Sequence, residues 1–171
     1  MTPYKLTDET KQIGDLTLHR IELTEDCKWG KKGDKGGWIE KEENLKQDAW
    51  VKDNACVYGN AFVFCNACVY GNACVFGNAV VFGDALVYGN AQVYGNACVF
   101  GNPLVYGDAL VDDNALVYGD AQVYGNARIH GKAVVCDNAR IYGKAGVFKN
   151  AIVCGDAQVG GYTVVYNGTI S

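Results

Sequence analysis

The sequence predicts an all-β solenoid, in which short strands stack as successive coils of one chain. A six-residue pattern, Ala-x-Val-x-Gly-Asn, runs from Ala49 to Asp156 through 18 hexads without an insertion. Position 1 is alanine in 17 hexads, position 3 is valine or isoleucine in all 18, and position 5 is glycine in 13. A fixed period of this kind is typical of repeat proteins whose units stack on their neighbours.

Each hexad reads as a short strand followed by a tight corner. Positions 1 and 3 are two residues apart, so on a strand they face the same side, and we expect alanine and valine to form the core. Positions 2 and 4 then face outward. Glycine and asparagine at positions 5 and 6 accept the backbone angles that a corner requires. A single hexad buries little apolar surface, so the hexads must stack.

The first 48 residues differ from the repeats and are predicted to cap them. They hold 9 of the 15 basic and 11 of the 19 acidic residues. Leu16 to Leu23 alternates apolar and polar side chains, which predicts a strand. We expect a turn from Lys31 to Gly37, after which Trp38 to Glu40 leads into the coils. The predicted parts are a strand-rich capping segment at 1–48 and a solenoid at 49–171, whose weaker hexads at 157–162 and 163–168 complete the far end.

Composition limits the functions that we expect. The net charge is −4, which disfavours nucleic acid as a partner. The sequence has no apolar run long enough for a membrane span and no signal-peptide core at its start, so we predict a cytoplasmic protein with no membrane partner. The eight cysteines are then expected to remain thiols. Nothing in the sequence indicates a cofactor.

The hexads resemble the hexapeptide-repeat family of left-handed parallel β-helices over about two-thirds of the chain. The resemblance implies a left-handed helix with three hexads in each triangular coil, and hence about six 18-residue coils. At a strand spacing of roughly 4.8 Å the prism would be about 29 Å tall. The segment from Gly33 to Glu40, followed by Glu42-Glu43-Asn44-Leu45 and Ala49-Trp50-Val51, is similar to the entry segment of YdcK-like β-solenoid proteins of bacteria and prophages.

With 18 residues in a coil, outward side chains stack at i, i+18 and i+36, which sorts them into three faces. The third face is apolar, and we predict that it is an interface of roughly 300 Å². Its predicted contact residues are Phe62, Phe64, Val80, Phe82, Cys98, Phe100, Leu116, Tyr118, Val134 and Ile152. The first face carries a tyrosine ladder, which stabilises the stack or forms a second binding face. Its members are Tyr70, Tyr88, Tyr106, Tyr124 and Tyr142.

Candidate catalytic and metal-binding groups are few. Hexapeptide-repeat acyltransferases use a histidine as general base, and the histidines here are His19 in the cap and His130 on the second face. Two histidines, one of them outside the coils, argue against a zinc site of the three-histidine kind. Two pairs of cysteines, 56 with 74 and 136 with 154, should stack on adjacent coils. We expect no histidine or carboxylate within reach of either pair, so these cysteines are interpreted as small apolar ladder residues, with no metal site.

The sequence therefore predicts a protein that is not an enzyme but a binding scaffold. We expect it to associate with itself, as a dimer or trimer, through the third face, or to bind a host protein there. The resemblance to prophage-type proteins favours a phage-encoded inhibitor of a host defence factor. Two alternatives stay open: an acyltransferase whose site lies near His130 at a subunit boundary, and a structural component of a phage.

Overall fold

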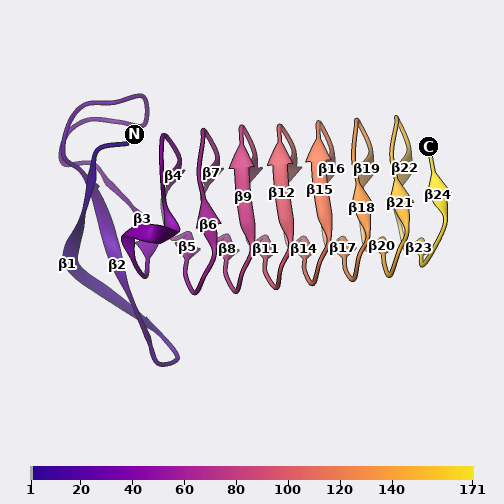
Figure 1. Ribbon diagram of the computed structural model, residues 1–171, viewed down its shortest axis with the longest axis horizontal. Helices are drawn as coiled ribbons and strands as arrows, with labels where there is room; N and C mark the ends of the chain where they lie inside the picture. The colour runs from indigo at the N-terminus through magenta and orange to yellow at the C-terminus, as the bar shows by residue number, and fades with distance from the viewer. Residues whose placement is uncertain (1) are drawn as a thin grey trace.

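The computed structural model describes residues 2–171 and confirms an all-β parallel solenoid. Seven coils stack along one axis, from the indigo cap at one end to the yellow final strand at the other (Figure 1). Each coil gives one short strand to each of three sheets, and these sheets form the three faces. Within the described residues, no helix is both long and apolar enough to pass through a bilayer.

The strands of each face follow one another at intervals of three in chain order. The first face consists of β4 (Trp50–Val51), β7 (Cys68–Val69), β10 (Leu86–Val87), β13 (Leu104–Val105), β16 (Gln122–Val123), β19 (Arg140–Ile141) and β22 (Gln158–Val159). The second face contains β5 (Cys56–Val57), β8 (Cys74–Val75), β11 (Gln92–Val93), β14 (Leu110–Val111), β17 (Arg128–Ile129), β20 (Gly146–Val147) and β23 (Val164–Val165). The third face contains β6 (Phe62–Val63), β9 (Val80–Gly83), β12 (Cys98–Gly101), β15 (Leu116–Gly119), β18 (Val134–Val135), β21 (Ile152–Val153) and β24 (Thr169–Ile170).

The register between coils confirms the 18-residue spacing. In the third face Cys98 pairs with Leu116, and in the first face Leu86 pairs with Leu104. The last pair of the third face joins Ile152 to Thr169, because the final coil is one residue shorter than the others. The expectation of about six coils is therefore extended by one, since the weak hexads after Asp156 complete a seventh coil.

The core is a column of alanine and valine, as the pattern predicts. Position 1 and position 3 residues such as Ala97, Val99 and Val117 are fully buried. Complete burial of one valine contributes about 1.5 kcal/mol or more. Because each coil repeats the same two core residues on each face, this stabilisation recurs along the whole stack.

The corners are held by the backbone and by ladders of amide side chains. The N–H of Asp84 donates to the carbonyl of Gly101 in the next coil at 2.7 Å, and equivalent bonds recur at the other corners. Along one corner the Nδ2 group of Asn72 donates to Oδ1 of Asn90 at 3.1 Å, and that of Asn90 donates to Oδ1 of Asp108 at 2.9 Å. The run stops there because an ionised carboxylate has no proton to donate.

The cap is an antiparallel hairpin that joins the second face through a parallel strand. Strands β1 (Tyr4–Ile13) and β2 (Leu16–Leu23) pair with each other, β2 pairs with β3 (Lys35–Ile39), and β3 pairs in parallel with β5. A 3-10 turn, η1 (Glu42–Asn44), then leads to the first coil. Its Asn44 is fully buried, and Nδ2 of this residue donates to the carbonyl of Ala61 at 2.8 Å.

In the cap, one predicted strand is confirmed, while the predicted turn and the predicted exposure of two coil residues that contact the cap are wrong. The strand at 16–23 is confirmed with the predicted bounds. The turn predicted from Lys31 to Gly37 is too long, because β3 begins at Lys35. Among the side chains that the hexad pattern placed on the outer surface, Trp50 and Cys56 are buried at 2% and 1% exposure because cap residues cover them.

Candidate functional site

The third face gathers all ten predicted contact residues on one side of the stack. Four aromatic rings form its centre, with ring centroids 4.8 Å apart for Phe64 and Phe82, 5.1 Å for Phe82 and Phe100, and 4.9 Å for Phe100 and Tyr118. These rings are only half-buried, although each lies flat against the next. Strands β9, β12 and β15 have four residues each instead of two, so the strand pairing of this face extends further here than elsewhere in it.

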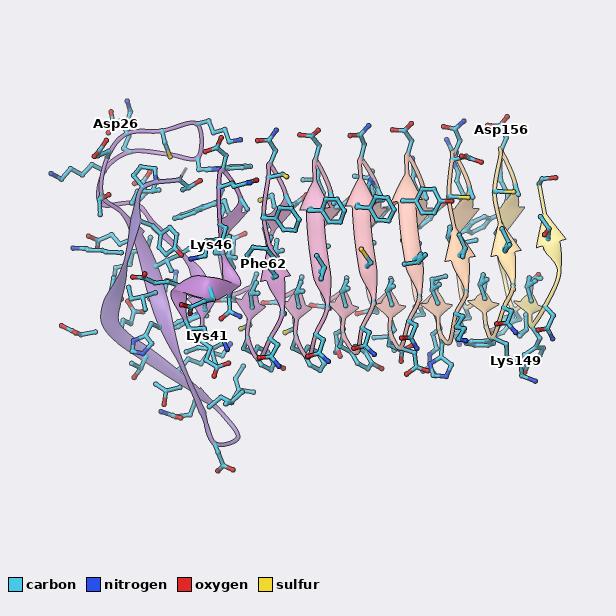
Figure 2. The ribbon with its side chains drawn as sticks, in the orientation of Figure 1. Asp26, Lys41, Lys46, Phe62, Lys149 and Asp156 are labelled. Carbon is cyan, nitrogen blue, oxygen red and sulfur yellow. The ribbon has the colours of Figure 1, made fainter. Side chains whose placement is uncertain are left out.

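A groove beside the cap borders the phenylalanine end of the third face. It encloses about 470 Å³ between η1 and β6, and Phe62 lines it together with Lys41, Lys46 and Asn60. Figure 2 shows Phe62 close to Lys41 and Lys46. Glu43 also lines this groove, so the apolar face ends against charged side chains of both signs at the cap.

The tyrosine ladder of the first face is also confirmed as one continuous stack. Its centroid spacing rises from 4.7 Å between Tyr70 and Tyr88 to 5.5 Å between Tyr124 and Tyr142. Partial burial raises the pKa values of Tyr70, Tyr88 and Tyr106, so these hydroxyls remain protonated at neutral pH. The ladder thus presents uncharged hydrogen-bonding groups along one side of the solenoid.

A polar cluster on the second face surrounds His130. Nδ1 of His130 lies 2.7 Å from Oδ1 of Asp112, and Nε2 lies 3.4 Å from Oδ2 of Asp113. A hydrogen bond to Asp112 raises the pKa of Tyr94 to about 12. Tyr94, Asp112 and His130 line a pocket of about 260 Å³, together with Leu110, Arg128 and Phe148. Asp112 was not identified from the sequence as a neighbour of His130, although their separation of 18 residues was the available signal.

The comparison with known families bears on these coils directly. Residues 91–103 and 121–137 match the YdcK β-solenoid repeat, and both segments lie within the regular hexads. These coils are therefore similar to the YdcK β-solenoid repeat, and the fold of the chain is a β-solenoid. A search of curated proteins found no match to the sequence.

The YdcK-like solenoid has one cysteine pair beneath its cap. Cys56 and Cys74 are register partners of β5 and β8, and Nζ of Lys11 lies 3.4 Å from Sγ of Cys56. A hydrogen bond from the Cys74 thiol, helped by the positive charge of Lys11, lowers the pKa of Cys56 to about 6. The same hydrogen bond raises the pKa of Cys74. This pair is therefore more than a stack of small apolar residues, because it shares one proton beside an ammonium group.

The second cysteine pair of the YdcK-like solenoid lies at the far end of the third face. Contrary to the sequence expectation, a carboxylate reaches it: the ligand atoms of Cys136, Asp137 and Cys154 all lie within 4.8 Å of one another. Burial raises the pKa of the Cys136 thiol, against a hydrogen bond from Tyr118 that lowers it. The expectation failed because Asp137 occupies a corner position, where the hexad pattern does not indicate the direction of the side chain.

Proposed function

We propose that this YdcK-like solenoid is a non-catalytic binding scaffold that associates with itself through the third face. The observation that carries the proposal is the half-buried aromatic column from Phe64 to Tyr118, which no charged side chain of positions 2 and 4 interrupts within the described coils. The largest exposed apolar patch of a protein is often a functional surface, and larger ones mark contact sites.

The dimensions of the face indicate what else such an interface must include. The ten contact residues span six of the seven strands, and a flat strip of this extent, about 10 Å wide and 29 Å tall, covers roughly 300 Å². A stable interface buries about 800 Å² on each partner. The apolar column would therefore form the dry centre, and the amide and carboxylate side chains of the two flanking corners would form a polar rim.

The solution mass of the reduced protein tests the proposal, and Leu116 is the residue to change. Leu116 lies in β15, the middle strand of the seven in the third face, and is only half-buried. We expect the wild type to be a dimer or trimer by light scattering after size exclusion, and Leu116→Glu to shift the mass toward the monomer.

A matched control is available on the first face. Leu104 has the same hexad position and the same partial burial as Leu116. Leu104→Glu should therefore keep the wild-type mass, with an unchanged circular dichroism spectrum in both variants. A wild-type monomer, or equal masses for the two leucine variants, would contradict self-association through the third face.

The finer proposal is that the protein is phage- or prophage-encoded and uses this face on a host defence factor. Its support is the resemblance to YdcK-like proteins, together with an apolar face that would suit a foreign surface as well as a second copy. A host protein retained by the wild type and by Leu104→Glu, but lost with Leu116→Glu, is the expected result. Equal retention by both variants would contradict this use of the face.

A second candidate function is acyl transfer at His130, which the 2.7 Å contact with Asp112 favours because a carboxylate orients a catalytic histidine in this way. The opposing observation is that the second ring nitrogen faces Asp113, whereas a general base needs a nitrogen that is open to substrate. Calorimetric titration with acetyl-CoA separates the two readings. Binding that is lost in His130→Ala would support the enzyme, and no binding would support the scaffold.

A further inference from the structure

The far end of the third face combines two thiols and a carboxylate in one small volume. Cys136 directly follows β18 and Cys154 directly follows β21, and these strands are neighbours in parallel register. Asp137 occupies the next corner position, and its Oδ2 atom lies 3.9 Å from Sγ of Cys136. The three donor atoms thus come from two adjacent coils and lie within 4.8 Å of one another.

The backbone fixes the position of the carboxylate. The N–H of Gly155 donates to Oδ2 of Asp137 at 3.0 Å, so the oxygen is oriented by the following coil. Asp137 has a left-handed backbone with φ of 58°, a conformation that aspartate enters more readily than most residues. Asp53 accepts an equivalent bond from Gly71, which indicates that the corner bond is a general device. The two thiols beside Asp137 are what distinguish this corner.

We propose that Cys136, Asp137 and Cys154 bind a thiophilic divalent cation, with zinc preferred. This inference goes beyond the scaffold function. Thiolates select zinc over magnesium or calcium, and a carboxylate oxygen is a common further ligand. Three protein donors leave the fourth tetrahedral position to a water molecule.

The distances suit tetrahedral zinc after a small movement of side chains. Zinc–sulfur bonds of about 2.3 Å and zinc–oxygen bonds of about 2.1 Å place two sulfurs about 3.8 Å apart, and a sulfur and an oxygen about 3.6 Å apart. The 3.9 Å from Sγ of Cys136 to Oδ2 of Asp137 is already close to this value. The remaining separations, at most 4.8 Å, need a closure of about 1 Å, which side-chain rotation supplies.

The other stacked pair of cysteines provides an internal control. Cys56 and Cys74 are also register partners, but no carboxylate joins them in a described group of metal-ligating side chains. Instead Nζ of Lys11 lies 3.4 Å from Sγ of Cys56, where its positive charge repels a cation. Cation binding should therefore depend on one cysteine pair and be independent of the other.

Cobalt titration of the untagged, phosphine-reduced protein tests the site. Thiolate ligands give Co²⁺ a near-ultraviolet charge-transfer band that histidine and carboxylate ligands do not give, which separates this site from the cluster at His130. We expect one Co²⁺ per chain, displaced by one Zn²⁺, with the band retained in the Cys56→Ser/Cys74→Ser variant. The band should be lost in Cys136→Ser/Cys154→Ser.

Asp137→Asn tests the carboxylate separately, because asparagine keeps the side-chain shape and tolerates the left-handed backbone. We expect it to weaken cobalt binding at least tenfold, since even outer-shell partners of a metal are worth about 10- to 100-fold. Circular dichroism of each variant checks the fold.

A titration without the band, a band that survives loss of Cys136 and Cys154, or a band that depends equally on Cys56 and Cys74 would overturn the proposal. Failure of zinc to displace cobalt would overturn the preference for zinc.

The mass measurement keeps this inference distinct from the scaffold function. A monomeric protein that binds cobalt through Cys136 and Cys154 would support the metal site and contradict self-association. A dimer without the charge-transfer band would do the reverse.

Discussion

Replacement of Gly83 by alanine tests whether backbone contact between coils limits the residue at a corner. Gly83 ends β9 with φ of 77°, and a Cβ atom added there would lie 2.6 Å from the carbonyl oxygen of Gly101 and 2.9 Å from its nitrogen. Gly161 occupies the same hexad position in the last coil, with φ of 65°, and an added Cβ would have no atom within 4 Å. Gly83→Ala and Gly161→Ala therefore both place alanine in the left-handed backbone region, but only Gly83→Ala brings the new Cβ atom against the backbone of Gly101.

The expected magnitudes follow from these two contributions. Left-handed backbone costs alanine about 1–2 kcal/mol relative to glycine. Crowding against fixed backbone adds about 1–3 kcal/mol, and it applies at Gly83 alone. Alanine also lowers the entropy of the unfolded chain in both variants, which offsets about 0.4–1 kcal/mol in each. The difference between Gly83→Ala and Gly161→Ala is thus about 1–3 kcal/mol, because the shared contributions cancel.

Thermal unfolding followed by circular dichroism measures this difference. For a chain of this size 1 kcal/mol corresponds to about 2–4 °C, so Gly83→Ala should melt about 2–12 °C below Gly161→Ala. Gly83→Asn separates the two causes, since asparagine enters the left-handed region at lower cost while its Cβ meets the same Gly101 backbone. Equal melting temperatures for the two alanine variants would refute the argument that adjacent coils exclude a side chain at this corner.

Two further predictions concern the core and the thiol pair under the cap. Val117→Ala should lower the free energy of unfolding by about 2 kcal/mol or more in urea titrations, because Val117 is fully buried, whereas Val164→Ala, at a position 46% exposed, should change it by a few tenths. The pKa of Cys56 is lowered to about 6 and that of Cys74 is raised, so the folded pair holds one proton fewer than the unfolded chain between pH 6 and about 8.5. Stability should therefore rise with pH across this window, and the contribution should be lost as the pH falls through 6. Cys56→Ser should flatten that part of the pH profile, and a profile identical to the wild type would contradict the shared proton.

Much of the solenoid could be predicted because the six residues of each hexad determine its strand and its corner without contacts that are distant in the sequence. Two core positions, two outward positions and a corner determine the strand, and the 18-residue coil then places Phe64, Phe82 and Phe100 in one column. The same arithmetic predicted the tyrosine ladder. These predictions needed only side-chain alternation and the period, which do not depend on contacts distant in the sequence.

The remaining features depend on contacts that the period does not encode. Cys56 and Trp50 are buried because the cap packs on them, and the cap has no repeat from which its position could be predicted. Strand β1 was not predicted individually because its charged residues hide the alternation. The position of the Asp137 carboxylate near Cys154 depends on the left-handed backbone of Asp137 and on the hydrogen bond that the N–H of Gly155 donates to it.

The three-sided coil gives insertions and deletions in this chain a geometric meaning. Addition of 18 residues would lengthen the prism by one coil and leave every column continuous, because each face gains one member. Addition of six residues would turn everything downstream by one face. If placed after Asn96, it would end the phenylalanine column at Phe82, and beyond the inserted hexad this face would continue with residues of the second face, such as Asp112 and His130. Evolution can thus extend a recognition surface in whole coils, or exchange one surface for another in single hexads, while the alanine and valine core stays the same.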